Sequence, residues 1–422
     1  MADTAAAGFD APRATLAVIK SMRDAPFHVR LALKRLLGLE YGTVTIAFPS
    51  GRRLRFEGRK PGPDGVLLVH NFGFARKALT RGDIGFAEGY MDGDWDTPDL
   101  GALFESMVLN LDGLIGVVAG GPFTRFITGI QHRLRANSKR QARRNIAAHY
   151  DLGNEFYRRW LDPSMTYSAA VYETGEEGLE DAQAKKYRQL ANMVGLQNGE
   201  SVLEIGCGWG GFARLAASEF DAHVSGLTLS VEQKAWAEDL LSREGLAEKT
   251  DIRLQDYRDE TGQYDRIVSI EMIEAVGEEY WPTYFGKIAE ALKPGGRAGI
   301  QAITIRDDLF EDYRRRTDFI QKYIFPGGML ISKQKIREQA ERAGMKLVDM
   351  NCFADGYART LEAWDEAFVK SWKEIAPLGF DERFKKMWRV YLRYCAAGFR
   401  YGRIDVGQYV LEKPDALEKP AA

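Results

Sequence analysis

The sequence has few cysteines. There are three in 422 residues, at Cys207, Cys352 and Cys395. They lie far apart along the chain, so they match neither a disulfide framework nor the short spacings of a metal site. This usage is typical of a reducing compartment, and we predict a cytoplasmic protein without a metal centre.

Long hydrophobic runs are also missing. The longest strongly apolar run, residues 113–123, is about half of the roughly 20 residues that a membrane-spanning helix needs. The N-terminal stretch MADTAAAGFDAPR lacks the basic-then-apolar order of a signal peptide. We therefore expect no segment that spans a membrane.

Acidic residues are absent from residues 113–150, although the whole chain carries a net charge of only −2. The basic residues of this stretch are Arg125, Arg133, Arg135, Lys139, Arg140, Arg143 and Arg144. One interpretation is a solvated helix face. The alternative is attraction to anionic lipid headgroups, worth roughly 1 kcal/mol per basic residue. The adjoining apolar segment 100–123 favours a membrane surface over nucleic acid. Since we also find no nucleic-acid-binding motif, we predict peripheral association with the inner membrane leaflet.

The order of expected elements predicts two domains. Residues 1–40 read as helices, and TVTIAFPSGRRLRFEG reads as two strands around a turn. From about residue 180, apolar strands alternate with helices, which argues for a parallel sheet in a doubly wound α/β domain. The expected strands are SVLEI, HVSGL, DIRLQ, YDRIVSIEM and GGRAGIQAITI. We predict an α+β N-terminal domain over 1–140, a catalytic domain over 141–410 and a disordered tail over 411–422.

A glycine-rich loop, VLEIGCGWGGF at 202–212, follows the first of these strands and opens a helix. Its G-x-G-x-x-G spacing allows the backbone to approach a nucleotide-type ligand closely. NAD would need an acid at the end of the next strand, but Asp221 precedes that strand and Glu232 follows it on a helix. Glu204, just before the first glycine, gives a strand-Glu-x-Gly-x-Gly arrangement similar to that of S-adenosylmethionine (SAM) methyltransferases.

Seven ordered motifs make the resemblance specific. They are HYDLGNEFYRRWLDPSMTYSAAVY, VLEIGCGWGG, SGLTLSVEQ, QDYRD, SIEMIEAVG, YIFPGG and YCAAGFRYGRIDVGQ. Together they resemble the cyclopropane-fatty-acyl-phospholipid synthase family, which includes the mycolic acid cyclopropane synthases. The resemblance covers about residues 145–410 and implies a class I SAM-methyltransferase fold with helical insertions. It also implies methyl transfer from SAM to the cis double bond of an unsaturated phospholipid acyl chain.

The resemblance also implies which residues hold SAM. Tyr167 and Ser168 are similar to the pair near the methionine carboxylate, and Glu204 stands beneath the loop glycines Gly206 and Gly208. The family holds the ribose at the positions of Thr228, Leu229 and Gln233. Asp256 and Tyr257 resemble the pair around the adenine, and Ile270 lines the same pocket.

The family's proton acceptor resembles a bicarbonate ion held by a cysteine backbone, a glutamate, a histidine and a tyrosine, and here the sequence departs from the pattern. Glu274 and Tyr357 match the family's glutamate and tyrosine, and we expect both to be catalytic. The family positions for a cysteine and two histidines are taken by Ala169, Ala302 and Ala275, and Glu271 replaces a glycine. Two of the groups that surround the ion in the family are therefore missing, the cysteine at position 169 and the histidine at position 302. If Glu271 lies close to Glu274, mutual repulsion raises one pKa and gives a group that can accept or share a proton. Otherwise Glu271 is a capped or solvent-facing residue at a strand end.

Two products stay open at this stage: a cyclopropane, or a methyl- or methylene-branched chain formed with a separate redox partner. The resemblance is compatible with a homodimer. Two other classes are a methyltransferase for a soluble small molecule and an inactive lipid-binding protein. The basic and apolar stretch and the aromatic helix 384–399 argue against a soluble substrate. The full set of SAM motifs argues against an inactive lipid-binding protein.

Overall fold

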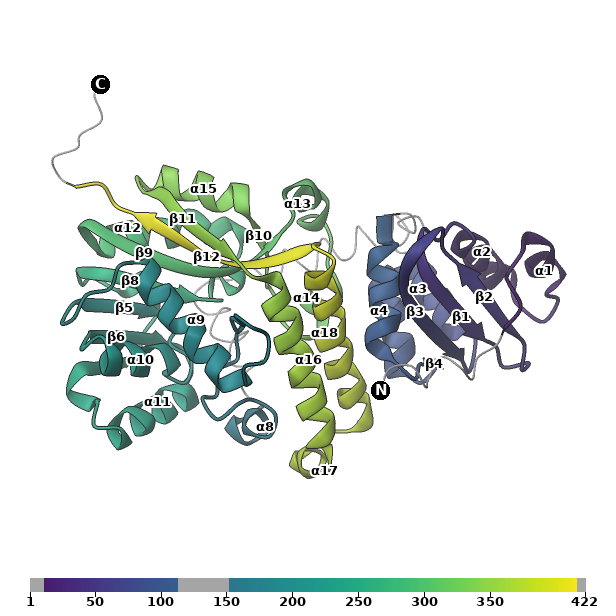
Figure 1. Cartoon of the computed structure of the whole chain (residues 1–422), viewed down its shortest axis with the longest axis horizontal. Coiled ribbons are helices and arrows are strands. Elements are labelled where there is room, and N and C mark those ends of the chain that lie inside the picture. The colour runs from purple at the N-terminus through teal and green to yellow at the C-terminus, as the bar shows by residue number, and fades with distance from the viewer. Residues whose placement is uncertain (1–10, 113–151, 416–422) are drawn as a thin grey trace, which may run out of the picture. The chain divides into compact units, whose positions relative to one another are not determined.

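The structure, a computed structural model, describes residues 11–112 and 152–415 (Figure 1). The basic stretch 113–150, the predicted boundary at 140 and most of the predicted tail lie outside this description. The described residues form two compact units. The first contains residues 11–112, 315–324 and 376–401, and the second contains 152–314, 325–375 and 402–415. The segments 315–324 and 376–401 thus group with the N-terminal part of the chain, whereas the sequence analysis placed them in the catalytic region.

The first unit is built on a four-stranded sheet with the order β2-β1-β3-β4. Its strands are β1 (Tyr41–Ala47), β2 (Arg53–Glu57), β3 (Lys60–Val69) and β4 (Trp95–Asp96). Strands β1 and β2 pair antiparallel, which confirms the predicted hairpin, and β1 and β3 pair parallel. Gly51 in the hairpin turn has φ of 80°, a left-handed conformation that favours glycine.

Helices complete the first unit. They are α1 (Leu16–Ser21), α2 (Phe27–Leu36), α3 (Gly73–Met91), α4 (Leu100–Leu109), α14 (Phe319–Tyr323) and α18 (Glu382–Arg400). Asn110 ties the end of α4 to the sheet, because its side-chain oxygen accepts from the N–H groups of Glu40 and Tyr41 at 2.9 and 3.0 Å. No helix in either described range is long and apolar enough to cross a membrane.

The second unit is an α/β domain around a large sheet with the order β11-β12-β9-β8-β5-β6-β7, with β10 pairing on β9. Its strands are β5 (Ser201–Ile205), β6 (His223–Thr228), β7 (Thr250–Leu254), β8 (Tyr264–Ile270), β9 (Leu292–Ile305), β10 (Ile331–Ser332), β11 (Lys346–Cys352) and β12 (Ile404–Glu412). Strands β5 to β9 are parallel, which confirms the doubly wound prediction. Strand β12 is antiparallel to both β9 and β11 and runs to Glu412, so Leu411 and Glu412 belong to the sheet and not to a tail.

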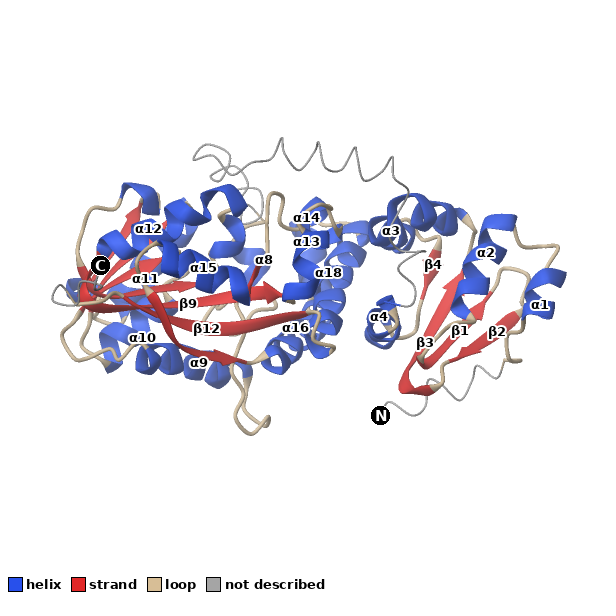
Figure 2. Ribbon diagram, turned by 90° about the horizontal axis from the view of Figure 1, so that it is seen from above, coloured by secondary structure: helices blue, strands red, loops and turns tan. Residues whose placement is uncertain are grey.

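The helices of this unit are α8 (Asn154–Arg158), α9 (Leu179–Met193), α10 (Gly211–Glu219), α11 (Val231–Arg243), α12 (Trp281–Ala291), α13 (Asp307–Tyr313), α15 (Lys333–Arg342), α16 (Ala354–Lys370) and α17 (Trp372–Ile375). Some of them cover the two faces of the sheet. In Figure 2, α12 and α15 lie above the strands and α9 and α10 below them. Successive strand residues point to opposite faces, so Val202 packs in the cluster with α9 and α10 while Leu203 packs in the cluster with α12 and α15.

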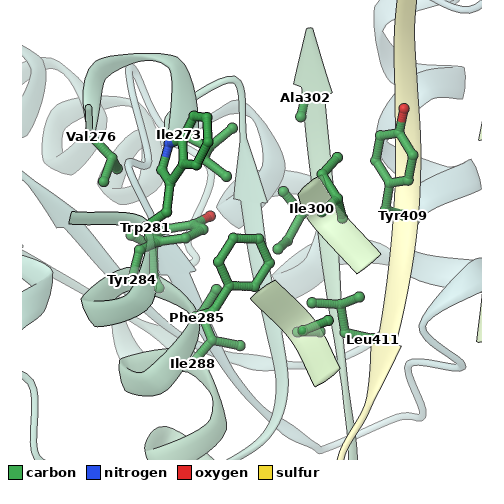
Figure 3. Close-up of a cluster of buried hydrophobic side chains, with 14 of the residues drawn as sticks. Ile273, Val276, Trp281, Tyr284, Phe285, Ile288, Ile300, Ala302, Tyr409 and Leu411 are labelled. Carbon is green, nitrogen blue, oxygen red and sulfur yellow. The ribbon is translucent and has the colours of Figure 1, made fainter. Parts of the chain in front are cut away.

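The core on the α12 side is rich in aromatic residues. Figure 3 shows Trp281, Tyr284 and Phe285 of α12 facing Ile300 of β9 and Leu411 of β12. Pro282 occupies the first turn of α12, where its missing N–H costs no hydrogen bond. This packing fixes the strands whose carboxyl ends carry the site described next.

Candidate active site

The glycine loop between β5 and α10 shapes the centre of the site. Its backbone is held against β6, because the N–H groups of Gly206 and Cys207 both donate to the Leu227 carbonyl at 3.0 and 2.9 Å. Gly206 has φ of 82°, and a Cβ added there would lie 2.9 Å from Met272 Cγ. A Cβ on Gly211 would lie 2.7 Å from the Tyr187 hydroxyl. The first and third glycines of the spacing therefore serve a tight turn and a close helix contact.

A cavity of about 170 Å³ opens beside this loop. It lies at the carboxyl ends of the parallel strands, where doubly wound sheets bind their ligands. All the residues predicted to bind the cofactor line it: Tyr167, Ser168, Glu204, Gly206, Gly208, Thr228, Leu229, Gln233, Asp256, Tyr257 and Ile270. The structure therefore brings together segments that span 104 positions of the chain, from 167 to 270 counted inclusively.

The polar residues along one wall are fixed by their own hydrogen bonds. Thr228 Oγ1 donates to Gln233 Oε1 at 2.9 Å and accepts from the Ser230 N–H at 3.1 Å. Asp256 lies in a two-point ion pair with Arg258, whose Nε and Nη2 donate to the two carboxylate oxygens at 2.8 and 2.6 Å. These contacts orient the side chains before any ligand arrives.

Glu204 is a buried acid in the cavity wall. One of its carboxylate oxygens, Oε2, has no hydrogen-bond partner among the described residues. Burial raises the pKa of Glu204 well above its usual range, and the charge of Lys186 opposes that shift. Lys186 is itself fully buried, with its ammonium 4.1 Å from the centre of the Tyr187 ring. Burial lowers the pKa of Lys186 to about 7.

Glu271, also in the cavity wall, is held by donors from distant segments. Its Oε1 accepts from Ser168 Oγ at 2.6 Å, from the Ala169 N–H at 2.8 Å and from Gln301 Nε2 at 2.9 Å. Its Oε2 accepts from the Tyr357 hydroxyl at 2.7 Å. Glu271 directly follows the end of β8 and is half-buried, and its carboxylate is held by these four donors.

Glu274 lies in the short helical turn η4 (Ile273–Ala275), directly after the strand end that carries Glu271. Its Oε1 accepts from the Ile303 N–H at 2.6 Å, and its Oε2 has no hydrogen-bond partner in the part of the chain that the structure describes. Burial and then the charge of Glu271 raise the pKa of Glu274 to about 8. The pair therefore matches the predicted arrangement of two carboxylates, one of which holds its proton at neutral pH.

An aromatic cluster adjoins this pair. Trp364 lies with its ring centre 5.2 Å from that of Tyr167 and 6.2 Å from that of Tyr357. Trp160 meets Tyr167 edge-on at 5.7 Å. Because aromatic faces attract cations, such a cluster suits a site where positive charge is bound or develops.

The sheet order, the glycine loop and the cavity at the strand ends define a class I SAM-dependent methyltransferase. Among solved structures, the chain is similar to the cyclopropane synthase MmaA2 of Mycobacterium tuberculosis, with a TM-score of 0.60 and 33% identity over 64% of this chain and 98% of that one. It is also similar to the mycolic acid cyclopropane synthase CmaA1 in a complex with SAH, with a TM-score of 0.61 and 31% identity over the same shares.

The chain belongs to the mycolic acid cyclopropane synthetase family, whose sequence profile matches residues 137–409. Two relatives extend the likeness further. The tuberculostearic acid methyltransferase UfaA1 of Mycobacterium tuberculosis is 41% identical over 82% of each chain. The cyclopropane-fatty-acyl-phospholipid synthase of Escherichia coli is 38% identical over 82% of this chain and 87% of its own.

The residues present fit SAM. The orphaned oxygen of Glu204 suits the cofactor's ammonium group, and the open backbone at Gly208, where an added Cβ would meet nothing within 4 Å, leaves space for close approach. The pre-oriented Thr228 and Gln233 offer polar groups for a ribose. SAM is thus the cofactor of this enzyme, and when bound it supplies an electrophilic methyl group on sulfur.

The residues present do not fit a bicarbonate ion. The Ala169 N–H and the Tyr357 hydroxyl, which the resemblance assigns to that ion, already donate to Glu271. Ala302 has no polar side chain and lies in the buried apolar cluster of Figure 3. A second anion beside Glu271 would be repelled and short of donors, which is costly in a buried site.

The sequence analysis did not predict five residues of the site: Trp160, Lys186, Arg258, Gln301 and Trp364. The sequence could have indicated that Lys186 is buried, because it lies four residues after Ala182 and four before Leu190, on the buried face of α9. Arg258 follows Asp256 by two residues, a spacing too common to indicate an ion pair. Gln301 lies on β9, 30 residues from Glu271, and no local pattern indicates their contact.

Proposed function

We propose that this enzyme transfers the methyl group of SAM to a carbon of a cis double bond in an unsaturated phospholipid acyl chain. The observation that carries the proposal is the carboxylate pair of Glu271, which lines the SAM cavity, and its neighbour Glu274. Methylation of an alkene leaves a carbocation, and a base must then remove a proton. A methyl acceptor that attacks with a lone pair forms no carbocation, so it does not need a carboxylate that removes a proton from carbon.

The chain's residues supply positioning, water exclusion and charge stabilisation. An alkene is a weak nucleophile, so its alignment with the S–CH₃ bond is the main requirement, and positioning of this kind is worth roughly 7–11 kcal/mol. The aromatic cluster of Tyr167, Tyr357 and Trp364 stabilises the developing cation, a contribution of about 2 kcal/mol when water is excluded.

The product we propose is a cyclopropane, formed when the proton leaves the transferred methyl group. The likeness to the Escherichia coli synthase supports both this product and a phospholipid substrate. A branched product is the second candidate, because the relative UfaA1 is named for tuberculostearic acid and because Ala169 and Ala302 depart from the family pattern. That route requires a redox partner if a saturated methyl branch is formed.

Incubation of the purified protein with labelled SAM and cis-unsaturated phospholipid vesicles, followed by mass spectrometry of the fatty acids, tests both candidates. We expect a mass increase of one CH₂ and loss of the olefin. Retention of an olefin in the methylated chain would establish the branched route. A Glu274→Gln variant that kept full activity would remove Glu274 from the mechanism.

Membrane docking through the basic residues of 125–144 is part of the proposal. The sequence supports it by the absence of acids from 113–150. Co-sedimentation with anionic and with neutral liposomes, at low and high salt, is the test. We expect binding to anionic liposomes that weakens with salt, and binding indifferent to lipid charge would contradict it.

A further inference from the structure

The Glu271 carboxylate occupies a built anion site. Its four donors come from Ser168 and Ala169, from Gln301 on β9 and from Tyr357 on α16. Gln301 is fixed in turn, because its amide nitrogen also donates to Ser168 Oγ at 3.1 Å and its oxygen accepts from Gln408 at 3.1 Å. A network this complete holds one carboxylate in one place.

The backbone at Glu271 reinforces this placement. Its φ of 50° lies in the left-handed region, which non-glycine residues adopt rarely and at a cost. The Glu271 N–H donates to the Gln301 carbonyl at 2.8 Å, which ties the strained residue to the neighbouring strand. The strand end of β8 is therefore shaped to aim this side chain into the network.

The two oxygens of Glu271 are not equivalent. Oε1 accepts three hydrogen bonds, whereas Oε2 accepts one, from Tyr357. A carboxylate has about four lone-pair sites, so Oε2 keeps a free one. Glu271 is among the residues that line the cavity, and Glu274 is not among the described residues that do.

Resting on the function proposed above, we propose that Glu271 is the proton acceptor of the reaction and replaces an added anion such as bicarbonate. The electron pair of the alkene forms a bond to the methyl carbon, and the S–C bond electrons stay on sulfur. Glu271 Oε2 then takes a proton from the cation, and the electrons of that C–H bond close the ring. If the proton comes from a chain carbon, the same electrons form a new double bond.

Glu274 keeps the pair singly charged. With the Glu274 carboxyl protonated, the pair of Glu271 and Glu274 carries one negative charge, on Glu271, which is the member that lines the cavity. The Tyr357 hydroxyl, which donates to Oε2, stabilises the ionised Glu271 carboxylate before it accepts the proton. No oxidant or reductant enters this step.

The first experiment asks whether the activity of the wild-type enzyme depends on bicarbonate. Methyl transfer to cis-unsaturated phospholipid vesicles is measured in buffer stripped of dissolved carbon dioxide and again with added bicarbonate. We expect equal rates. Activity that disappears without bicarbonate and returns with it would overturn the proposal, without any variant that could misfold.

Two variants complete the experiment. Glu271→Gln should bind SAM by calorimetry yet lose activity by about 10²- to 10⁴-fold. Glu271→Gly empties the anion site, and added formate or bicarbonate should restore part of its activity. Full activity of Glu271→Gln overturns this inference alone, whereas a wild-type enzyme that methylates no unsaturated lipid overturns the proposed function with it.

Discussion

Arg258 and Asp256 form a two-point ion pair in the wall of the SAM cavity, with side-chain exposures of 11% and 1%. The pair is local, since the Arg258 N–H also donates to Asp256 Oδ1 at 3.0 Å. Removal of the guanidinium would leave a buried carboxylate without its counter-charge. Such a change costs far more than the pair itself is worth.

We therefore expect Arg258→Met to lower the free energy of unfolding by about 3 kcal/mol and to weaken SAM binding. Denaturant titration and calorimetry measure the two effects. The double variant Asp256→Asn with Arg258→Met removes both charges and should recover much of the stability. Equal stability of the single variant and the wild type would contradict the prediction.

Glu204 should release a proton when SAM binds. Burial raises the pKa of Glu204 well above its usual range and so favours the protonated carboxyl in the free protein, whereas the cofactor's ammonium favours the ionised form. SAM affinity should thus rise with pH until it passes the pKa of Glu204. Calorimetry in buffers of different ionisation enthalpy detects the released proton.

In Glu204→Gln this proton release should vanish, and SAM affinity should fall by about 10- to 100-fold, since a hydrogen bond to a charged group is worth roughly 1.5–3 kcal/mol. Glu232→Gln on the exposed side of α11 is the matched control. Unchanged proton release in Glu204→Gln would assign the effect to another group.

The pKa of Glu274, raised to about 8, predicts a pH-dependent stability. A raised pKa means that the folded state favours the protonated carboxyl. The contribution of Glu274 to the free energy of unfolding is complete below the ordinary pKa of Glu and is lost as pH rises through about 8. The free energy of unfolding falls by roughly 1.4 kcal/mol per pH unit at most. A glutamine at this position lacks this dependence.

We expect the Tm of Glu274→Gln minus that of the wild type to increase between pH 5 and about 8 and to level off above it. Thermal unfolding of both proteins across this range is the measurement. A difference that stays constant with pH would show that Glu274 ionises in the folded protein as it does in the unfolded chain.

Gly299 on β9 packs directly against α9. A Cβ there would lie 2.6 Å from Leu190 Cδ1 and 2.7 Å from Val194 Cγ1. Gly299→Ala should therefore destabilise the protein by about 1–3 kcal/mol through overpacking.

Gly286 on the exposed side of α12 is the control, because a Cβ there meets nothing within 4 Å. Gly286→Ala should stabilise the protein by up to about 1 kcal/mol, since alanine favours helices. Changes of the same sign in both variants, measured by denaturant unfolding, would refute the packing argument.

The sequence predicted the parts of the molecule that local patterns encode. Strands β5 to β9 are apolar and separated by helices, and the glycine loop lies within one short segment. Strand β11 was missed because its sequence KLVDMNC is mostly exposed and shows no regular alternation. The antiparallel position of β12 depends on pairing with β9, about a hundred residues earlier in the chain.

The environment of Glu271 was not predictable in the same way. Its partners Ala169 and Tyr357 are 102 and 86 residues away, and their contact exists only in the folded chain. The sequence did indicate that a carboxylate there could lie near Glu274, since both follow one strand. It could not indicate that the Ala169 N–H and the Tyr357 hydroxyl, which the resemblance assigns to a bicarbonate ion, would donate to Glu271 instead.

The left-handed backbone at position 271 has an evolutionary consequence. Glycine, the residue that the family resemblance leads one to expect there, adopts that conformation without strain, and glutamate adopts it here. Codons GGA and GGG for glycine become glutamate codons by one base change. A single mutation can thus replace a bound bicarbonate ion by the carboxylate of a glutamate side chain, without a change in the backbone conformation at this position.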